Sequence, residues 1–180
     1  MNLKQFSLSR FSLSHVKRFS CSAIVLILSC VAIFAQDRDK TSVTVNGATI
    51  TIDYGRPALK GRDMLSQLGD GQVWRLGMNA ATQIETSKNL TVGGKQVPAG
   101  KYTLWLKKRG TGFLLCFHPK TGVWGAPPLT EGYIAELPLK SEKANDSAEQ
   151  LVITLSDNKG GALVKIQWGK DVLTGTLRVG

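Results

Sequence analysis

Apolar and polar residues alternate with a period of two along most of the chain beyond residue 40. Residues 41–54 read TSVTVNGATITIDY, in which two β-branched runs flank the pair Asn46-Gly47. Alternation of this kind indicates strands with one buried face rather than amphipathic helices. Because Asn and Gly both tolerate the positive φ angles of a type I′ turn, this segment is predicted to form a β-hairpin.

The same pattern continues to the C-terminus, interrupted by turns rich in glycine, proline and asparagine. Further predicted strands cover residues 82–86, 90–92, 102–107, 113–118, 133–139, 150–156, 162–168 and 172–179. The run FLLCFH at 113–118 is apolar enough to be buried on both faces. Short strands at intervals of about a dozen residues predict an all-β fold, a single-domain antiparallel β-sandwich that is jelly-roll-like or barrel-like.

Two segments depart from the strand pattern. Residues 62–68 (RDMLSQL) place three apolar side chains on one face, which predicts one short helix of two turns that ends at Gly69. Residues 141–148 (SEKANDSA) are polar and charged, so we expect a solvated loop between strands. Neither segment has the composition of a linker between domains.

The first 35 residues have the pattern of a secretory signal peptide. Residues 1–20 carry four basic and no acidic side chains, and residues 21–35 form an unbroken apolar run. We expect cleavage after Ala35, which leaves residues 36–180 as a single domain with no stable membrane insertion. The expected location is secreted or periplasmic. Alternatively, an uncleaved leader or a lipid on Cys30 anchors the protein to the membrane.

Removal of this leader changes the cysteine count and the charge. Cys21 and Cys30 leave with it, so Cys116 is the remaining cysteine and no intrachain disulfide is expected. The leader carries four of the 23 Lys and Arg residues and none of the 13 Asp and Glu residues, so the net charge falls from +10 to +6. A positive balance favours anionic partners. Nucleic acid is not expected as a partner, because the chain has an export signal and no basic helix.

The segment from Tyr54 to Thr82, which we call the arc, concentrates cationic and aromatic side chains between glycines and prolines. Arginine presents a planar fork of donors suited to carboxylate, phosphate or sulfate, and aromatic rings stack on sugars and on guanidinium groups. Loops on a rigid β fold are common binding sites. We therefore predict a concave, cationic, aromatic-lined site for a small anionic or carbohydrate ligand. Its predicted ligand-binding residues are Tyr54, Arg56, Arg62, Trp74, Arg75 and Asn79.

The same side chains also have a structural interpretation. Arg56 and Arg75 can tie loops to backbone carbonyls or to nearby Asp residues, and Trp74 has the size to plug the end of the fold. Asn79 is of a residue type that is common in turns. Both interpretations of the arc stay open at the level of sequence.

Signals for catalysis are few. His118 is the single histidine beyond the leader, and neither an HExxH nor a CxxC motif is present. A Cys116-His118 pair, two residues apart on one strand, is a conceivable nucleophile and base, but a free Cys in an apolar run is usually an inert core residue. No two carboxylates are singled out as an acid–base pair. We predict no catalytic residues, no metal site and no cofactor.

Several motifs together resemble the bacterial secreted family catalogued as domain-of-unknown-function family 2911. They are YGRP (54–57), KGR (60–62), VWRLGMNAAT (73–82), VGGKQVPAGKYTLW (92–105) and WG (124–125). The resemblance covers residues 41–180 and implies an exported, β-sandwich-like domain without an established activity. The family pattern often reads GANEAT, whereas this chain has Met78 for the first Ala and Ala80 for the Glu.

The predicted function is that of an exported, non-catalytic binding or structural accessory module, with the arc as its functional surface. The alternative is a small hydrolase or lyase acting on a glycan or anionic substrate, in which Arg56, Arg62 and Arg75 hold charge and a carboxylate or His118 acts as base. The oligomeric state is not predicted.

Overall fold

The computed structural model describes residues 38–180, and this part of the chain is built from β-strands, turns and irregular loops. The predicted signal peptide, residues 1–35, lies outside the described residues. The strands are β1 (Arg38–Val45), β2 (Ala48–Gly55), β3 (Val73–Trp74), β4 (Thr82–Thr86), β5 (Leu90–Val92), β6 (Lys95–Val97), β7 (Gly100–Arg109), β8 (Gly112–His118), β9 (Ala135–Asn158) and β10 (Gly161–Val179).

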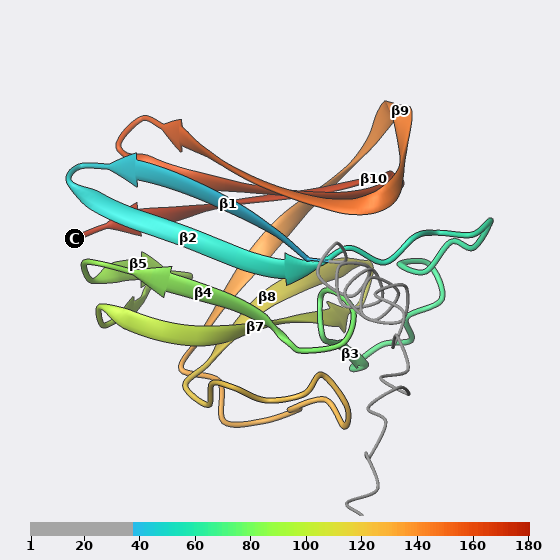
Figure 1. Ribbon diagram of the computed structural model, residues 1–180, viewed down its shortest axis with the longest axis horizontal. Coiled ribbons are helices and arrows are strands. Elements are labelled where there is room, and N and C mark those ends of the chain that lie inside the picture. Colours follow the sequence, from blue (N-terminus) through green and yellow to red (C-terminus); the bar gives the residue numbers. More distant parts are fainter. Residues whose placement is uncertain (1–37) are drawn as a thin grey trace, which may run out of the picture. The chain divides into compact units, whose positions relative to one another are not determined.

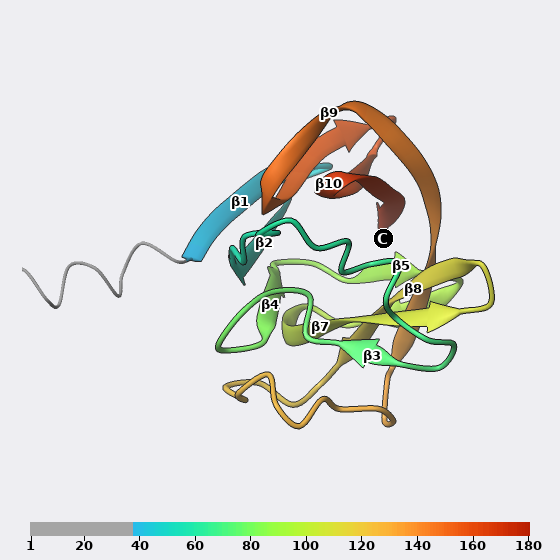
Figure 2. The ribbon, with the colours of Figure 1, turned by 90° about the vertical axis from the view of Figure 1, so that its right-hand side faces the viewer.

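All the strands belong to one antiparallel sheet. Its hydrogen-bonded order is β1-β2-β4-β7-β8-β9-β10-β5-β6, and the two-residue β3 pairs with β7. The long β9 joins the two halves of this order, because its first residues pair with β8 and later residues pair with β10. Figures 1 and 2 show β9 bending from beside β8 to the opposite side of the molecule, so that the sheet folds over on itself.

The predicted all-β, antiparallel fold is confirmed, as a single large sheet. Within residues 38–180 the order ends at β1 and β6, so the hydrogen bonding does not close into a barrel. The free edge of β9 instead approaches the end of β2 through a single bridge, between Ala58 and Gln150. No helix in the described part of the chain is long and apolar enough to span a membrane.

The predicted hairpin at the start of the fold is confirmed. Val45 pairs with Ala48, which leaves a two-residue loop. Asn46 and Gly47 in that loop have φ angles of 49° and 70°. Positive φ at both central residues gives the turn a twist that matches the right-handed twist of the flanking strands. The Asn46 side chain also donates to the Gly160 carbonyl at 3.0 Å, which ties this turn to the β9–β10 turn.

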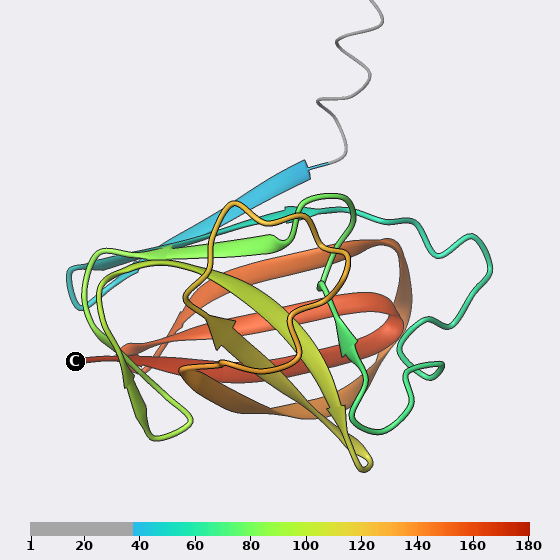
Figure 3. The ribbon, with the colours of Figure 1, turned by 90° about the horizontal axis from the view of Figure 1, so that it is seen from below.

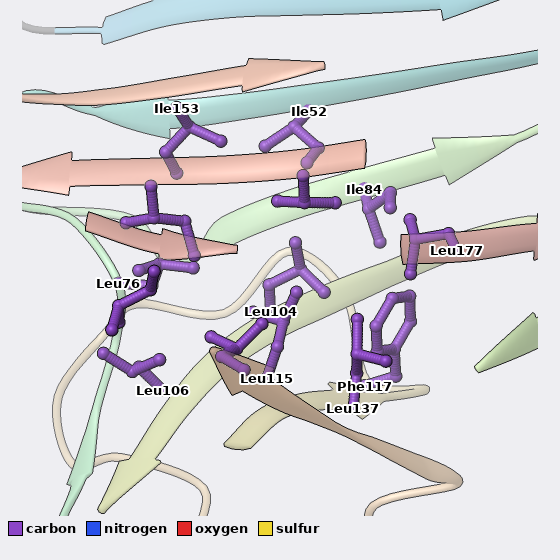
Figure 4. Packing of buried hydrophobic residues seen from close by; sticks show 14 of the residues in the cluster. Ile52, Leu76, Ile84, Leu104, Leu106, Leu115, Phe117, Leu137, Ile153 and Leu177 are labelled. Carbon is purple, nitrogen blue, oxygen red and sulfur yellow. The ribbon is translucent and has the colours of Figure 1, made fainter. Parts of the chain in front are cut away.

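The main hydrophobic core lies on the inner face of the folded sheet. Figure 4 shows side chains from β2, β4, β7, β8, β9 and β10 pointing toward one another, and Ile52, Leu104 and Leu115 among them are completely buried. Burial contributes about 1.5–3 kcal/mol for each aliphatic side chain of this size. The protein thus rests on a core drawn from nearly every strand.

A smaller second core forms on the outer face of β7 and β8. Trp105 and Cys116 are completely buried there, and Val123 and Tyr133 from the loop between β8 and β9 pack over them. Figure 3, in which the molecule is seen from below, shows this loop crossing in front of the strands. The loop explains why residues 113–117 are all buried, as predicted from their continuous apolar run.

The predicted helix at residues 62–68 is wrong. The segment forms isolated turns instead, in which Asp63 Oδ1 accepts the Ser66 N–H at 3.2 Å and the Leu65 carbonyl accepts the Leu68 N–H at 3.4 Å. Seven residues between glycines are too few to offset the cost of helix nucleation. Leu65 still turns inward and is only 3% exposed. The apolar pattern therefore predicted the burial of Leu65 correctly, but it did not predict the backbone geometry.

The predicted loop at residues 141–148 is also wrong, because β9 runs through it without a break. Ser141 pairs with Leu173 of β10 and Lys143 pairs with Asp171. These residues of β9 are exposed for the most part, so their sequence lacks the alternation that marks a half-buried strand. The predicted strands 162–168 and 172–179 are one strand, β10, and residues 169–171 between them form a bulge where the register shifts at Gly169.

Candidate functional site

The arc brings three cationic side chains around one hollow at the end of the molecule where β2 stops, on the right in Figure 1. We call this site the basic hollow; its volume is about 320 Å³. The residues that line it are Arg56, Pro57, Ala58, Lys60, Arg62, Met78 and Gln150. No carboxylate belongs to this lining.

The loop that carries the basic hollow is fixed to the free edge of β9. The Leu151 N–H donates to the Pro57 carbonyl at 3.0 Å, and the Leu59 N–H donates to the Glu149 carbonyl at 2.8 Å. Pro57 lacks an N–H of its own, so only its carbonyl takes part. These bonds hold the backbone on both sides of Ala58 in an extended form.

Arg56 is held from two sides. Its Nε donates to the Leu151 carbonyl at 3.3 Å, and its Nη1 lies 3.7 Å from Asp39 Oδ2. The side chain is 31% exposed. Because a guanidinium group has five donors, these contacts orient Arg56 and leave donors for a ligand.

Arg62 is exposed, and its side chain makes one hydrogen bond within residues 38–180, from Nε to the Leu59 carbonyl at 3.3 Å. It also borders a neighbouring hollow of about 400 Å³. The charge there is mixed, since Lys143 and Asp171 form an ion pair at 2.6 Å on its wall. Arg62 therefore stands between the basic hollow and a more neutral one.

Tyr54 supports the basic hollow from beneath instead of lining it. Its side chain belongs to the main core and is 1% exposed. Its hydroxyl donates to Asp39 Oδ2 at 3.3 Å, the same oxygen that faces Arg56. Burial raises the pKa of the Tyr54 phenol, so it stays a neutral donor.

Trp74 packs on the main core. Its ring stacks on Trp168 with centroids 4.9 Å apart and an angle of 7° between the planes. Trp168 is 4% exposed, and its indole N–H has no hydrogen-bond partner among residues 38–180. Parallel stacking of two large rings closes this end of the core, which is the structural role that the sequence left open for Trp74.

Arg75 and Asn79 lie together, away from the lining of the basic hollow. Arg75 Nη1 donates to the Asn79 carbonyl at 3.4 Å, and the same carbonyl accepts the Gly125 N–H at 3.1 Å. The Arg75 side chain lies so close to Gly125 that a Cβ there would be 2.2 Å from Arg75 Cδ. Asn79 has a φ of 60°, in keeping with its expected place in a turn.

The sequence profile of a family described as "Protein of unknown function (DUF2911)" matches residues 36–175. The chain belongs to this family. The resemblance predicted from the motifs is thereby confirmed. No curated protein and no solved structure matches the chain. Membership in DUF2911 therefore brings a sequence family but no reaction and no ligand.

Sequence reasoning found part of the lining of the basic hollow in this DUF2911 domain and missed the rest. Lys60 lies in the KGR motif, between the two arginines that were predicted, so a signal for it existed. Met78 reaches the hollow because the backbone around it passes directly over Gly55. Gln150 comes from β9, far along the chain, and no local pattern marks it.

The Cys116-His118 pair of the DUF2911 domain lacks the properties of a nucleophile and its base. Burial and the nearby Glu136 carboxylate raise the pKa of the Cys116 thiol to about 12. The thiol therefore stays protonated near neutral pH, and the thiolate is the reactive form. Burial also lowers the pKa of His118, whose Nδ1 accepts the Lys120 N–H at 2.9 Å.

Among residues 38–180 of the DUF2911 domain, no three His, Cys, Asp or Glu side chains gather closely enough to hold a metal ion. A further hollow of about 440 Å³ lies at the β9–β10 turn and is bordered by Lys159 and Arg178. That turn lies at the other end of the molecule from the arc (Figure 1). Both hollows that Arg62 borders have the volume of a small-molecule site, and the basic hollow is the one whose lining contains no carboxylate.

Proposed function

We propose that this protein is an exported binding module that takes a small anionic ligand in the basic hollow. The observation that carries the proposal is the gathering of Arg56, Lys60 and Arg62 around one concavity whose lining contains no carboxylate. Its volume of about 320 Å³ falls in the range of small-ligand sites. A carboxylate, phosphate or sulfate group would find charged donors on several sides there.

The backbone around the basic hollow supports binding without large rearrangement. Arg56 is oriented by Asp39 and by the Leu151 carbonyl, and the loop is bonded to β9. Holding donors in place before the ligand arrives reduces the entropy lost on binding. Lys60 and Arg62 are exposed and are the residues expected to contribute most of the new contacts.

The hydrolase or lyase alternative needs an acid or base that points at the bound ligand. Three carboxylates beside the lining residues already have partners: Asp39 faces Arg56, Glu149 Oε1 accepts the Lys60 N–H at 3.0 Å, and Asp63 Oδ1 accepts the Ser66 N–H. His118 is on β8 and does not line the hollow. We therefore favour binding over catalysis.

The basic n-region and apolar run of residues 1–35 support action outside the cytoplasm, in the periplasm or the medium. A folded-over sheet with a core from nearly every strand supports the use of the domain as a rigid, sandwich-like scaffold. Small anionic metabolites and acidic sugars are the ligand classes that match both the charge and the setting. Nucleic acid is not proposed.

Isothermal titration of the protein with inorganic phosphate, sulfate, citrate and glucuronate at low ionic strength tests the proposal. We expect at least one of these anions to bind, and the substitution Arg62→Ala to weaken that binding about tenfold, since a charged hydrogen bond contributes roughly 1.5–3 kcal/mol. Arg109→Ala is the matched control, because Arg109 is an exposed arginine at the end of β7, outside the lining of the basic hollow. Both variants lose the same charge.

Binding that is weakened equally by Arg62→Ala and Arg109→Ala would reflect net charge alone and contradict the proposed site. No heat change with any of the four anions would also contradict it. Release of a product from an added ligand would instead support the hydrolase or lyase alternative for this site.

A further inference from the structure

Trp124 is the one large hydrophobic side chain that is exposed among residues 38–180, with 62% of its surface accessible. It lies on the loop between β8 and β9. The other three tryptophans pack against the two cores: Trp105 and Trp168 are buried, and Trp74 is half-buried. An exposed indole in a chain that buries its other tryptophans requires a separate explanation, because leaving a side chain of this size in water forgoes the free energy of its burial.

The backbone that carries Trp124 is held on both sides. The Ala81 N–H donates to the Val123 carbonyl at 3.2 Å, and the Gly125 N–H donates to the Asn79 carbonyl at 3.1 Å. These two bonds flank Trp124 and tie the loop to the segment that leads into β4. The indole therefore projects from a fixed base, and a ligand would not have to order a mobile loop.

The residue opposite Trp124 is small, and polar residues lie beside its loop. Ala80 faces Trp124 across the bridge, and its methyl group is too small to cover an indole. Arg38 Nη1 donates a hydrogen bond to the Ala80 carbonyl at 3.2 Å. Arg75 lies against the residue that follows Trp124, and the Asn79 side chain is exposed.

We propose that Trp124 is a stacking platform for the ring of a neutral sugar in a polysaccharide or oligosaccharide. A sugar ring has an apolar face of C–H groups and a rim of hydroxyls, which matches an isolated, exposed indole on a loop with polar residues beside it. A protein partner fits less well. Protein interfaces bury about 800 Å² on each side around an apolar centre, and Trp124 is a single apolar side chain without exposed large neighbours in the described part of the chain.

This site is independent of the basic hollow. Met78 lines the hollow, whereas Asn79 and Arg75 face the Trp124 loop, so the turn of the arc separates the two sites. Uncharged sugars require no cation in the basic hollow. Anion binding in the hollow requires no contact with Trp124.

Acrylamide quenching of tryptophan fluorescence tests the proposal, on protein purified after expression of the full chain. The probes are the hexasaccharides of β-1,4-glucose, α-1,4-glucose and β-1,4-N-acetylglucosamine, all of them neutral. We expect at least one to protect the exposed fluorescence of the original protein, and we expect Trp124→Ala to raise the Kd of that sugar, measured by calorimetry, about tenfold. We expect Trp124→Phe, which keeps an aromatic face, to bind within about threefold of the original protein in a titration by calorimetry.

Three outcomes overturn the proposal. The first is that none of the three hexasaccharides protects the fluorescence. The second is binding, measured by calorimetry, that Trp124→Ala leaves unchanged, which assigns the sugar to another surface. The third is concentration-dependent self-association that Trp124→Ala abolishes, which assigns Trp124 to an interface with a second copy. Because all probes are uncharged, each of these results leaves the proposed anion site as it was.

Discussion

Thr82 is completely buried, and its hydroxyl donates to the Leu76 carbonyl at 2.6 Å. This bond closes the turn that carries Met78 toward the basic hollow and Asn79 toward Trp124. The space beside Thr82 is filled, since a Cβ on Gly77 would lie 3.0 Å from Thr82 Oγ1. A single hydroxyl therefore helps to hold the part of the arc that separates the two proposed sites.

Replacing this hydroxyl with a methyl group gives a prediction for stability. Thr82→Val keeps the shape of the side chain but leaves the Leu76 carbonyl without its donor, so we expect the free energy of unfolding to fall by about 1–3 kcal/mol. Urea unfolding measures the change. Thr82→Ser retains the hydroxyl and should lose less. Equal stability of the valine variant and the original protein would mean that the carbonyl finds another donor.

At the scale of elements, the end of β2 and the turn of the arc are in direct contact. A Cβ on Gly55 would lie 2.4 Å from the Met78 carbonyl oxygen and 2.9 Å from its nitrogen. Both atoms belong to the backbone, so no side-chain rotation relieves the overlap. Glycine is required at this position because two backbones touch, and its conformational freedom is not the reason.

Gly55→Ala should therefore displace the turn and lower the free energy of unfolding by about 2–3 kcal/mol. We also expect it to weaken anion binding, because Met78 lines the basic hollow. Gly112→Ala is a matched control, since a Cβ there would meet nothing closer than 3.8 Å. Urea unfolding and calorimetry with the anion that binds best report the two effects. If Gly55→Ala and Gly112→Ala behave alike, the close contact is not rigid.

The strands themselves were largely predictable, and the failures have local causes. The hairpin around Asn46-Gly47 and strands β4 and β5 lie where alternation and turn chemistry put them. The exposed stretch 141–148 of β9 has no buried face, so its pairing with β10 leaves no trace in its own composition. The segment 62–68 has an apolar face that matches both a helix and a turn with one buried leucine.

At the scale of the whole molecule, the fold is stabilised without a disulfide among its described residues. Cys116 is free and buried in the second core, beneath the loop between β8 and β9. Its pKa is raised to about 12 from a usual value near 9, mainly by burial. Access to its sulfur therefore requires the loop to leave or the whole sheet to unfold.

The reactivity of this thiol with a disulfide reagent should report global unfolding. At pH 8 we expect native Cys116 to react about a thousandfold more slowly than the unfolded chain, because a pKa raised by three units reduces the thiolate fraction by that factor. The substitutions Cys21→Ser and Cys30→Ser remove the thiols of any retained leader. Because the thiol reacts in the unfolded chain, raising the pH should speed the reaction only up to about pH 9, its usual pKa. Rapid labelling of the native protein at pH 8 would show that the loop opens on its own.

The sequence by itself determined the all-β class, most strand positions, the family and the segment in which cationic side chains concentrate. These properties follow from local periodicity, turn residues and motifs, which act over a few neighbouring residues. Only the tertiary structure decided how the arc is divided: Tyr54 and Trp74 belong to the core, Arg56 and Arg62 share a hollow with Gln150 of β9, and Arg75 lies against Gly125 in the loop that carries Trp124. These neighbours meet because the sheet folds over at β9, and that long-range pairing leaves no signal in the residues of the arc itself.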